Sequence, residues 1–276
     1  MSNSTKIAIG VISLGIVLAA GFSVWQSQAM DKKLSATNDN IQKLTASVLV
    51  LAQKVSEPGD IQSQVVNALA SIENTKIQQQ IALKEKKFEL ASNNNNTDKW
   101  IYGDIGARFT LVEFSDTECP YCKRFHDTPK KIVDTLQGDV NWEFVNLPLG
   151  FHNPAAEAQA IAMECVGLLK GNKAFWMMTD SIFKHTRGNG QGVSDLTALA
   201  LDNGVDKEEF EKCMASDVAR QNVYDDINKA QKLGITGTPA TFIVDNTTGK
   251  SQVLSGAQPP EAFLSVIRAM TADTGK

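Results

Sequence analysis

The chain has few of the residues that build most metal and nucleic-acid sites. Of its 276 residues only four are Cys and three are His, and its formal net charge is −4. A structural zinc site usually takes two Cys pairs, or two Cys with two His, and this chain has a single C-x-x-C pair. Without a basic excess or a basic stripe, its composition gives no support to nucleic-acid binding. We expect neither a structural zinc site, nor a cofactor, nor a nucleic-acid partner.

One long stretch without charge lies near the N-terminus. Residues 7–25 carry no charged side chain, which corresponds to about one bilayer crossing at roughly 20 residues per span. Trp25 lies at the end of this stretch, where aromatic rings favour the membrane interface. The apolar part of a signal peptide is usually only about 7–15 residues long, which favours an uncleaved anchor, although S-Q-A at 27–29 is an acceptable cleavage site. We therefore expect residues 1–30 to be an anchor or a signal segment, and the remainder to be exported.

A helical stalk is expected over residues 31–91. Its first part carries a seven-residue repeat of apolar side chains with polar residues between them, the pattern of a coiled coil. The positions of the repeat are Leu34, Ile41, Leu44, Val48, Leu51 and Val55. The alternative is an amphipathic helix that lies on the following domain. Pro58 and Gly59 end this part, and a second helical stretch follows over about 60–90.

The Asn-rich segment at residues 92–98 is expected to be a flexible linker between the stalk and a domain at 99–276. In that domain, strand-like segments alternate with helical ones, which predicts an α/β fold with a helical insertion at about 152–232. Glycine-rich breaks such as R-G-N-G-Q-G at 187–192 interrupt the insertion. The expected strands are 109–115, 140–149, 240–245 and 251–256. Outside the insertion we expect two helices, one that follows the cysteine-bearing segment at 119–122 and extends to about residue 137, and one over about 259–271.

The dithiol Cys119-Pro120-Tyr121-Cys122 opens one of these helices. At a helix N-terminus the free N–H groups and the helix dipole stabilise a thiolate, and in such motifs the pKa falls to roughly 3.5–7.5 from about 8.5. Cys122, one turn further and more buried, can then resolve a mixed disulfide that Cys119 has formed. Pro120 fits the first turn, where its missing N–H costs nothing. Pro120 and Tyr121, between the sulfurs, are expected to tune the redox potential.

Two other interpretations of the dithiol remain. Cys119, Cys122 and His126 could hold a soft ion such as copper(I), or zinc, in an exported metal-binding protein. The pair could also be a structural staple, but two Cys so close in sequence close a very small loop and constrain little of the unfolded chain.

Two segments resemble exported DsbA-type thioredoxin-fold proteins. Residues 102–125 resemble the active-site segment of that family, and G-I-T-G-T-P-A-T-F-I-V-D at 234–245 resembles its cis-proline segment. Two stretches between them, at 152–165 and 173–183, resemble its helical insertion. The resemblance implies a thioredoxin fold over about 99–270 and a thiol–disulfide oxidoreductase that needs no cofactor.

The same resemblance assigns roles to three further residues. Pro239 is expected to be cis and to face Cys119, and the Thr238 backbone to pair with an extended substrate segment. Glu113 is expected to move protons to and from Cys122, unless it is only a strand residue in an ion pair. Thr before the cis-proline, together with an N-terminal association segment, is similar to ScsC-type members and favours an isomerase or reductase. A disulfide-donating oxidase is the alternative.

The two remaining cysteines, Cys165 and Cys213, both lie in expected helices of the insertion. Spare cysteines of exported proteins often pair, but small apolar Cys is also common in cores, so a structural disulfide and two buried thiols are both open.

The expected partners follow from these interpretations. They are cysteine-containing exported proteins, a membrane redox partner, the bacterial inner membrane through residues 7–25, and further copies of the chain through the stalk. A single-pass location with the catalytic domain in the periplasm is expected, or a soluble periplasmic protein if residues 1–29 are removed.

Overall fold

The structure is a computed structural model that describes residues 42, 45–46, 60–91 and 99–272. Within these ranges no helix is long and apolar enough to cross a membrane. The apolar stretch at 7–25 and the six apolar positions of the heptad repeat lie outside the described residues. The chain divides into two compact units, the first ending at Ile77 and the second beginning at Gln78.

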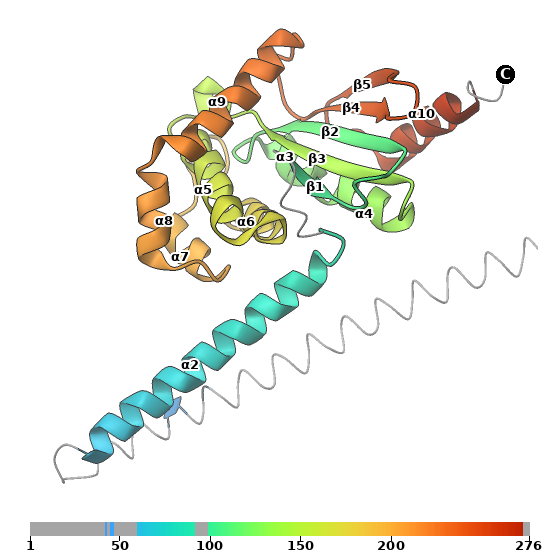
Figure 1. The fold of residues 1–276 in the computed structure, drawn as a ribbon. Helices are drawn as coiled ribbons and strands as arrows, with labels where there is room; N and C mark the ends of the chain where they lie inside the picture. The colour runs from blue at the N-terminus through green and yellow to red at the C-terminus, as the bar shows by residue number, and fades with distance from the viewer. Residues whose placement is uncertain (1–41, 43–44, 47–59, 92–98, 273–276) are drawn as a thin grey trace, which may run out of the picture. The chain divides into compact units, whose positions relative to one another are not determined.

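The second unit contains a five-stranded sheet with helices around it (Figure 1). The first unit contains the beginning of α2 (Asp60–Lys87), and the end of this helix belongs to the second unit. The further elements of the second unit are β1 (Trp100–Tyr102), β2 (Phe109–Ser115), α3 (Pro120–Phe125), α4 (Asp127–Thr135), β3 (Val140–Asn146), η1 (Gly150–His152), α5 (Ala155–Lys170), α6 (Asn172–His185), α7 (Leu196–Leu201), α8 (Lys207–Met214), α9 (Asp217–Lys232), β4 (Ala240–Asp245), β5 (Ser251–Ser255) and α10 (Pro260–Ala272).

The sheet has the strand order β1-β3-β2-β4-β5. β2 and β3 are parallel, and every other neighbouring pair is antiparallel. The α/β fold with a helical insertion predicted from the sequence is confirmed, and each expected strand is present. β1 was not expected, because three residues are too few to show a strand pattern.

The helix that follows the dithiol is split in two, although the sequence predicted one helix to about residue 137. α3 ends at Phe125 and α4 begins at Asp127. The reason is Pro129, which lacks an N–H and whose ring would clash with the carbonyl of Phe125, four residues earlier. α3 is therefore a short element whose main task is to present the two cysteines.

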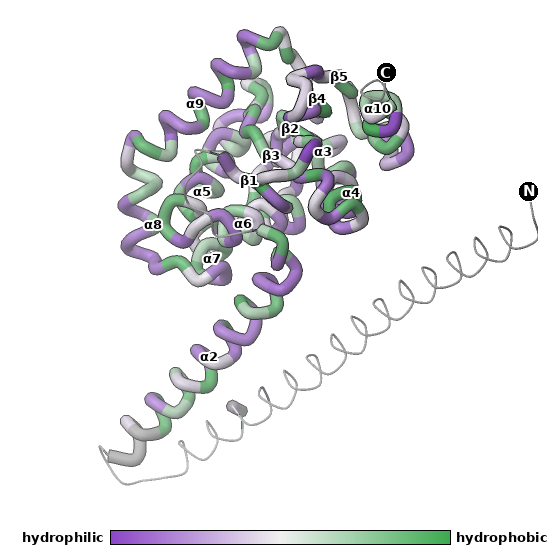
Figure 2. The backbone as a smooth tube through the Cα atoms, turned by 45° about the vertical axis from the view of Figure 1, so that its right-hand side comes forward, coloured by the Kyte–Doolittle hydropathy of each residue, from purple (hydrophilic) through white to green (hydrophobic). Residues whose placement is uncertain are grey.

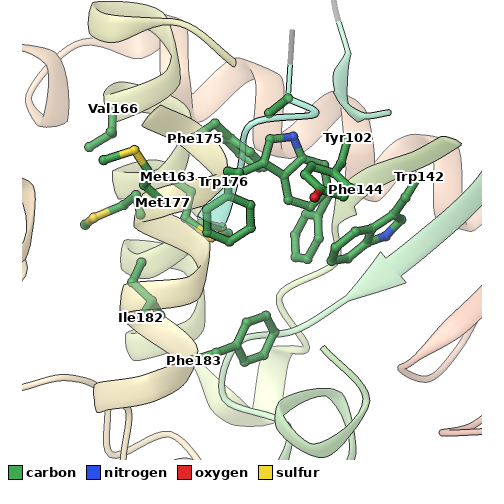
Figure 3. Packing of buried hydrophobic residues seen from close by; sticks show 14 of the residues in the cluster. Tyr102, Trp142, Phe144, Met163, Val166, Phe175, Trp176, Met177, Ile182 and Phe183 are labelled. Atoms are coloured by element: carbon green, nitrogen blue, oxygen red, sulfur yellow. The ribbon is translucent and has the colours of Figure 1, made fainter. Parts of the chain in front are cut away.

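Each face of the sheet packs against a hydrophobic cluster. Along β2 the side chains alternate, so that Phe109 and Leu111 join the larger cluster while Phe114 joins a smaller one with Val145. The larger cluster is rich in aromatic rings, and Trp142 lies 4.3 Å from Trp176, centroid to centroid (Figure 3). Full burial of side chains of this kind contributes about 1.5–3 kcal/mol each, so this cluster dominates the stability of the second unit.

The insertion α5–α9 forms a helical block beside the sheet (Figure 1). α9 leads from this block back to β4, and Ala230 near its end is buried in the smaller cluster. Hydrophobic and hydrophilic residues alternate along α9, as expected for a helix with one packed side (Figure 2).

The C-terminal end of α2 differs from the expected organisation. The sequence placed the whole of 31–91 in the stalk and the boundary at 92–98, whereas the compact second unit begins at Gln78. Phe88 and Ala91 are buried in the larger cluster, and the ring of Phe88 makes an edge contact with Tyr102 at 5.9 Å. The end of α2 and the residues that directly follow it, Phe88 and Ala91 among them, are therefore part of the folded domain.

Candidate active site

A tight turn between β2 and α3 fixes the position of the dithiol. The carboxylate of Asp116 accepts a hydrogen bond from the backbone N–H of Glu118 at 2.8 Å, and its carbonyl accepts one from the N–H of Cys119 at 3.1 Å. Cys119 has extended backbone angles and caps α3, whose first residue is Pro120. The sulfur-bearing residue thus stands where the N–H groups of a helix have no partner within the helix.

The two cysteines have opposite acid strengths. A hydrogen bond from the Cys122 thiol, with backbone N–H groups of Cys122 and Tyr121 against the opposing effect of burial, lowers the pKa of Cys119 to about 5. Burial and the neighbouring Cys119 raise the pKa of Cys122 well above its ordinary value. Cys119 is therefore a thiolate at neutral pH, and Cys122 is a thiol that must lose a proton before it can attack.

The proline loop lies against the nucleophile. The Thr238–Pro239 peptide bond is cis, and the Cys119 sulfur lies 3.6 Å from the carbonyl oxygen of Thr238, to which Cys119 donates only when it is protonated. β4 begins directly after this loop and pairs with β2, which brings residues 119 and 238 together across the sequence. The structure thus joins the two segments that the resemblance placed together.

Glu113 is fully buried in β2, opposite Thr241 of β4 and Phe144 of β3. The alternation of the strand places it on the same face as Leu111, whose cluster also contains Cys119 and Cys122. Burial raises the pKa of Glu113 to about 7; Ser115 and Trp142 oppose this, although neither makes a hydrogen bond of ordinary geometry to it. No ion pair involves Glu113 in the described part of the chain. A buried carboxyl with a pKa near neutrality is able to accept and return a proton.

Tyr121 is the exposed residue of the dithiol segment. Its side chain is 59% exposed, and the guanidinium of Arg124 lies 4.6 Å from the centre of its ring. A large ring held at the surface beside the nucleophile can contact a substrate chain.

His126 does not join the two cysteines. Its ring lies 4.5 Å from that of Phe183, and its Nε2 lies 3.5 Å from a carboxylate oxygen of Asp180. Among the described residues, no group of three or more His, Cys, Asp or Glu side chains could hold a metal ion. The third ligand that the metal interpretation requires is therefore not in place.

The other two cysteines are joined. Cys165 of α5 and Cys213 of α8 form a disulfide across 48 residues of sequence, with their Cα atoms 5.7 Å apart. This bond lies within the insertion and links two of its helices.

Sequence analysis missed the polar residues that support the turn. Besides the Glu118 N–H, the carboxylate of Asp116 accepts the backbone N–H of Leu149 at 2.9 Å and contacts Nδ1 of His152 at 2.7 Å. An Asp just before a helix is a recognisable turn signal, so Asp116 could have been found. The partners at 149–152 could not, because they come from the loop and the short helix η1 that follow β3, far from Asp116 in sequence.

Comparisons with known proteins agree with this geometry. The sequence profile of the family described as Thioredoxin matches residues 94–268. The crystal structure of Pseudomonas aeruginosa DsbA2 is 37% identical and covers 62% of this chain and 93% of its own, with a TM-score of 0.56. Disulfide bond formation protein D of Bacillus subtilis is 29% identical over 161 residues, which are 52% of this chain and 67% of that protein.

A third relative is much longer. The Na(+)/H(+) antiporter NhaA 1 of Mycolicibacterium gilvum is 29% identical over 177 residues, which are 63% of this chain and 26% of the antiporter. This chain thus spans about a quarter of the length of that relative.

A cysteine pair at a helix N-terminus lies beside a cis-proline loop, on a sheet with an inserted helical block. The chain belongs to the thioredoxin family, and its relatives there are DsbA-like thiol–disulfide oxidoreductases.

Proposed function

We propose that this chain is an exported thiol–disulfide oxidoreductase that acts on cysteine-containing proteins as an isomerase or reductase. The observation that carries the thiol–disulfide exchange activity is the position of Cys119, whose pKa is lowered and whose sulfur lies 3.6 Å from the Thr238 carbonyl oxygen, while the direction of the reaction is argued from other features.

The reaction follows from the unequal acidity of the two cysteines. The Cys119 thiolate attacks a disulfide of the substrate, forming a mixed disulfide and releasing one substrate thiolate, which takes up a proton. Cys122 then loses its proton, for which Glu113 is the proposed acceptor, and attacks the Cys119 sulfur. This step forms the Cys119–Cys122 disulfide and releases the second substrate thiolate. If a thiol of the substrate resolves the mixed disulfide instead, the substrate is isomerised and the dithiol is restored.

The substrate chain is proposed to lie across the proline loop. The Thr238 carbonyl oxygen lies 3.6 Å from the Cys119 sulfur, and at neutral pH, where Cys119 is a thiolate, or in a mixed disulfide, this sulfur has no proton to donate to it. The carbonyl can then accept an N–H of an extended substrate segment, while Tyr121, Pro120 and Pro239 contact its side chains.

An oxidase is the second candidate. A thiolate with a pKa near 5 stabilises the reduced dithiol, and a stable reduced form makes a disulfide a stronger oxidant. The name of the Bacillus subtilis relative, disulfide bond formation protein D, also favours this direction. Thr238 and the association segment favour the isomerase or reductase.

The N-terminal region completes the proposal. Residues 7–25 would hold the protein in a bacterial inner membrane with the second unit in the periplasm, and the stalk would bring several copies together. Several dithiols facing a common substrate suit an isomerase, which also needs a membrane partner that keeps its dithiol reduced.

The direction is tested by equilibrating the full-length chain with mixtures of reduced and oxidised glutathione and measuring the reduced fraction of the Cys119–Cys122 pair. An isomerase or reductase is expected to show a potential below about −200 mV, whereas a value near −120 mV would mean an oxidase. If no redox equilibrium were found, the oxidoreductase proposal itself would fail.

A further inference from the structure

The residue before the nucleophile directs a buried carboxylate into the helical insertion. Glu118 has no solvent-exposed surface. One of its carboxylate oxygens accepts the side-chain amide of Gln159 at 2.6 Å and also the hydroxyl of Thr186, and the other accepts the N–H of Gly192 at 2.9 Å. These donors come from α5, from the end of α6 and from the loop that follows it.

The loop at 186–192 has an unusual backbone that serves this contact. Gly188, Asn189, Gly190 and Gly192 all have positive φ angles, between 53° and 79°. Glycine adopts such angles at little cost, and Asn tolerates them. The result is that the Asn189 N–H donates to the Glu118 carbonyl oxygen at 2.7 Å while the Gly192 N–H reaches its carboxylate. The motif R-G-N-G-Q-G, which the sequence marked only as a break, thus closes around the residue next to Cys119.

The carboxylate is charged and has no cationic partner. Burial alone would raise its pKa, but hydrogen bonds from Thr186, Gln159, Gly192 and Gly190 lower the pKa of Glu118 below its ordinary value. In the described part of the chain no Lys, Arg or His nitrogen lies within 4.0 Å of it.

The neighbouring charged side chains make their hydrogen bonds to other groups than the Glu118 carboxylate. From α3, Lys123 donates to the Thr186 carbonyl at 2.7 Å, and from the loop Arg187 donates to the Gln191 carbonyl at 2.6 Å. From the turn before α3, Asp116 contacts His152 of η1. A full negative charge therefore remains buried one residue from the nucleophile.

We propose that Glu118 is a positioning residue that holds the start of α3 against the insertion and makes the Cys119–Cys122 disulfide a weaker oxidant. Its charge opposes the Cys119 thiolate, because two like charges in a poorly solvated region repel each other. A less stable thiolate shifts the exchange of dithiol and oxidised glutathione towards the protein disulfide and two reduced glutathiones. The inference rests on the redox function proposed above, which it deepens.

The test is Glu118→Gln in the full-length chain, measured by the pH dependence of Cys119 alkylation and by equilibration with glutathione. Without the charge, the pKa of Cys119 is expected to fall and the equilibrium to shift about tenfold towards the dithiol, a potential about 30 mV less negative. Asp206→Asn is the control, because it also removes one negative charge from the insertion while Asn still caps α8. It should change neither quantity by more than about twofold.

A second variant separates charge from packing. Thr186→Val removes a donor to the Glu118 carboxylate but leaves its charge in place. Because fewer hydrogen bonds then balance this charge, it should oppose the Cys119 thiolate more strongly, and the equilibrium with glutathione should shift towards the protein disulfide by about twofold or more. If the glutathione equilibrium shifted in the same direction in both variants, the proposed charge effect would be overturned. It would also be overturned if the equilibrium of Glu118→Gln were identical to that of the wild type. If Glu118→Gln did not fold, the Thr186→Val variant alone would overturn the proposed charge effect, provided that its potential was unchanged or less negative than that of the wild type. A wild-type chain with no redox equilibrium would instead defeat the underlying function.

Discussion

At the residue scale, two identical thiols acquire different roles from their positions three residues apart in one segment. Cys119 caps α3 and accepts hydrogen bonds that stabilise its thiolate, whereas Cys122 is fully buried one turn later and remains protonated. The hydrogen bond from the Cys122 thiol to Cys119, the free N–H groups at the start of α3 and the burial of Cys122 together produce this asymmetry.

Glu113 links this chemistry to stability. Its pKa rises from 4.5 to about 7 on burial, so between these pH values the folded protein holds a proton that the unfolded chain has released. The contribution of Glu113 to the free energy of unfolding is therefore fully present below about pH 4.5, and it is lost as the pH rises through about 7. Glu113→Gln removes the loss and should stabilise the protein at pH 8 by on the order of 2–3 kcal/mol, with little effect near pH 4. Urea unfolding across this range measures it.

The control for Glu113→Gln is the remaining pH dependence. Glu164 and Asp226 are also buried carboxyls whose pKa values are raised to about 7, so both proteins keep a decline in stability with pH. If the free energies of unfolding of wild type and variant ran parallel from pH 4 to pH 8, the pKa of Glu113 would not be raised by burial. Exchange with glutathione should also be slower in the variant, since Cys122 loses its proton acceptor.

At the scale of elements, the end of α2 is the clearest departure from the sequence-based prediction. Phe88→Ala removes a side chain that is 1% exposed and should lower the free energy of unfolding by about 3–5 kcal/mol. Leu168→Ala, at a side chain that is 46% exposed, should cost much less. If the two variants unfolded alike, Phe88 would belong to the stalk, as the sequence predicted.

The disulfide between α5 and α8 is predicted to be structural. For 48 residues of separation, loss of the cross-link costs about 4 kcal/mol in the chain-entropy description. The double variant Cys165→Ala/Cys213→Ala should therefore unfold at a lower urea concentration and still equilibrate with glutathione through Cys119 and Cys122. A variant of unchanged stability that no longer exchanged disulfides would reverse this assignment and make the second pair part of the redox centre.

At the scale of the whole molecule, local patterns predicted the α/β fold, the helical insertion and the dithiol at a helix N-terminus. The proximity of residues 119 and 238 came from a family resemblance, because contacts 119 residues apart in sequence leave no local signal. The boundary at 92–98 differed for a related reason. The burial of Phe88 depends on Tyr102 and the core beyond the linker, which the pattern of α2 alone does not show.

Glu118 illustrates the same difficulty. From the sequence alone, an acidic residue beside a cysteine is expected to be exposed to solvent. Only the packing of α5, α6 and the 186–192 loop shows that Glu118 is buried and fully hydrogen-bonded. Polar groups that are buried with all their partners depend on tertiary structure more than any other feature of a site.

The central claim is that Cys119 is the nucleophile and Cys122 the resolving thiol. It is tested most directly by alkylating the fully reduced, full-length chain over a range of roughly pH 3 to pH 9 and measuring the modification of each cysteine by peptide mapping. The reactivity of Cys119 should be half-maximal near pH 5, with Cys122 unreactive throughout that range. Equal titration of both cysteines near the ordinary thiol pKa of about 8.5, or faster reaction of Cys122, would contradict the account.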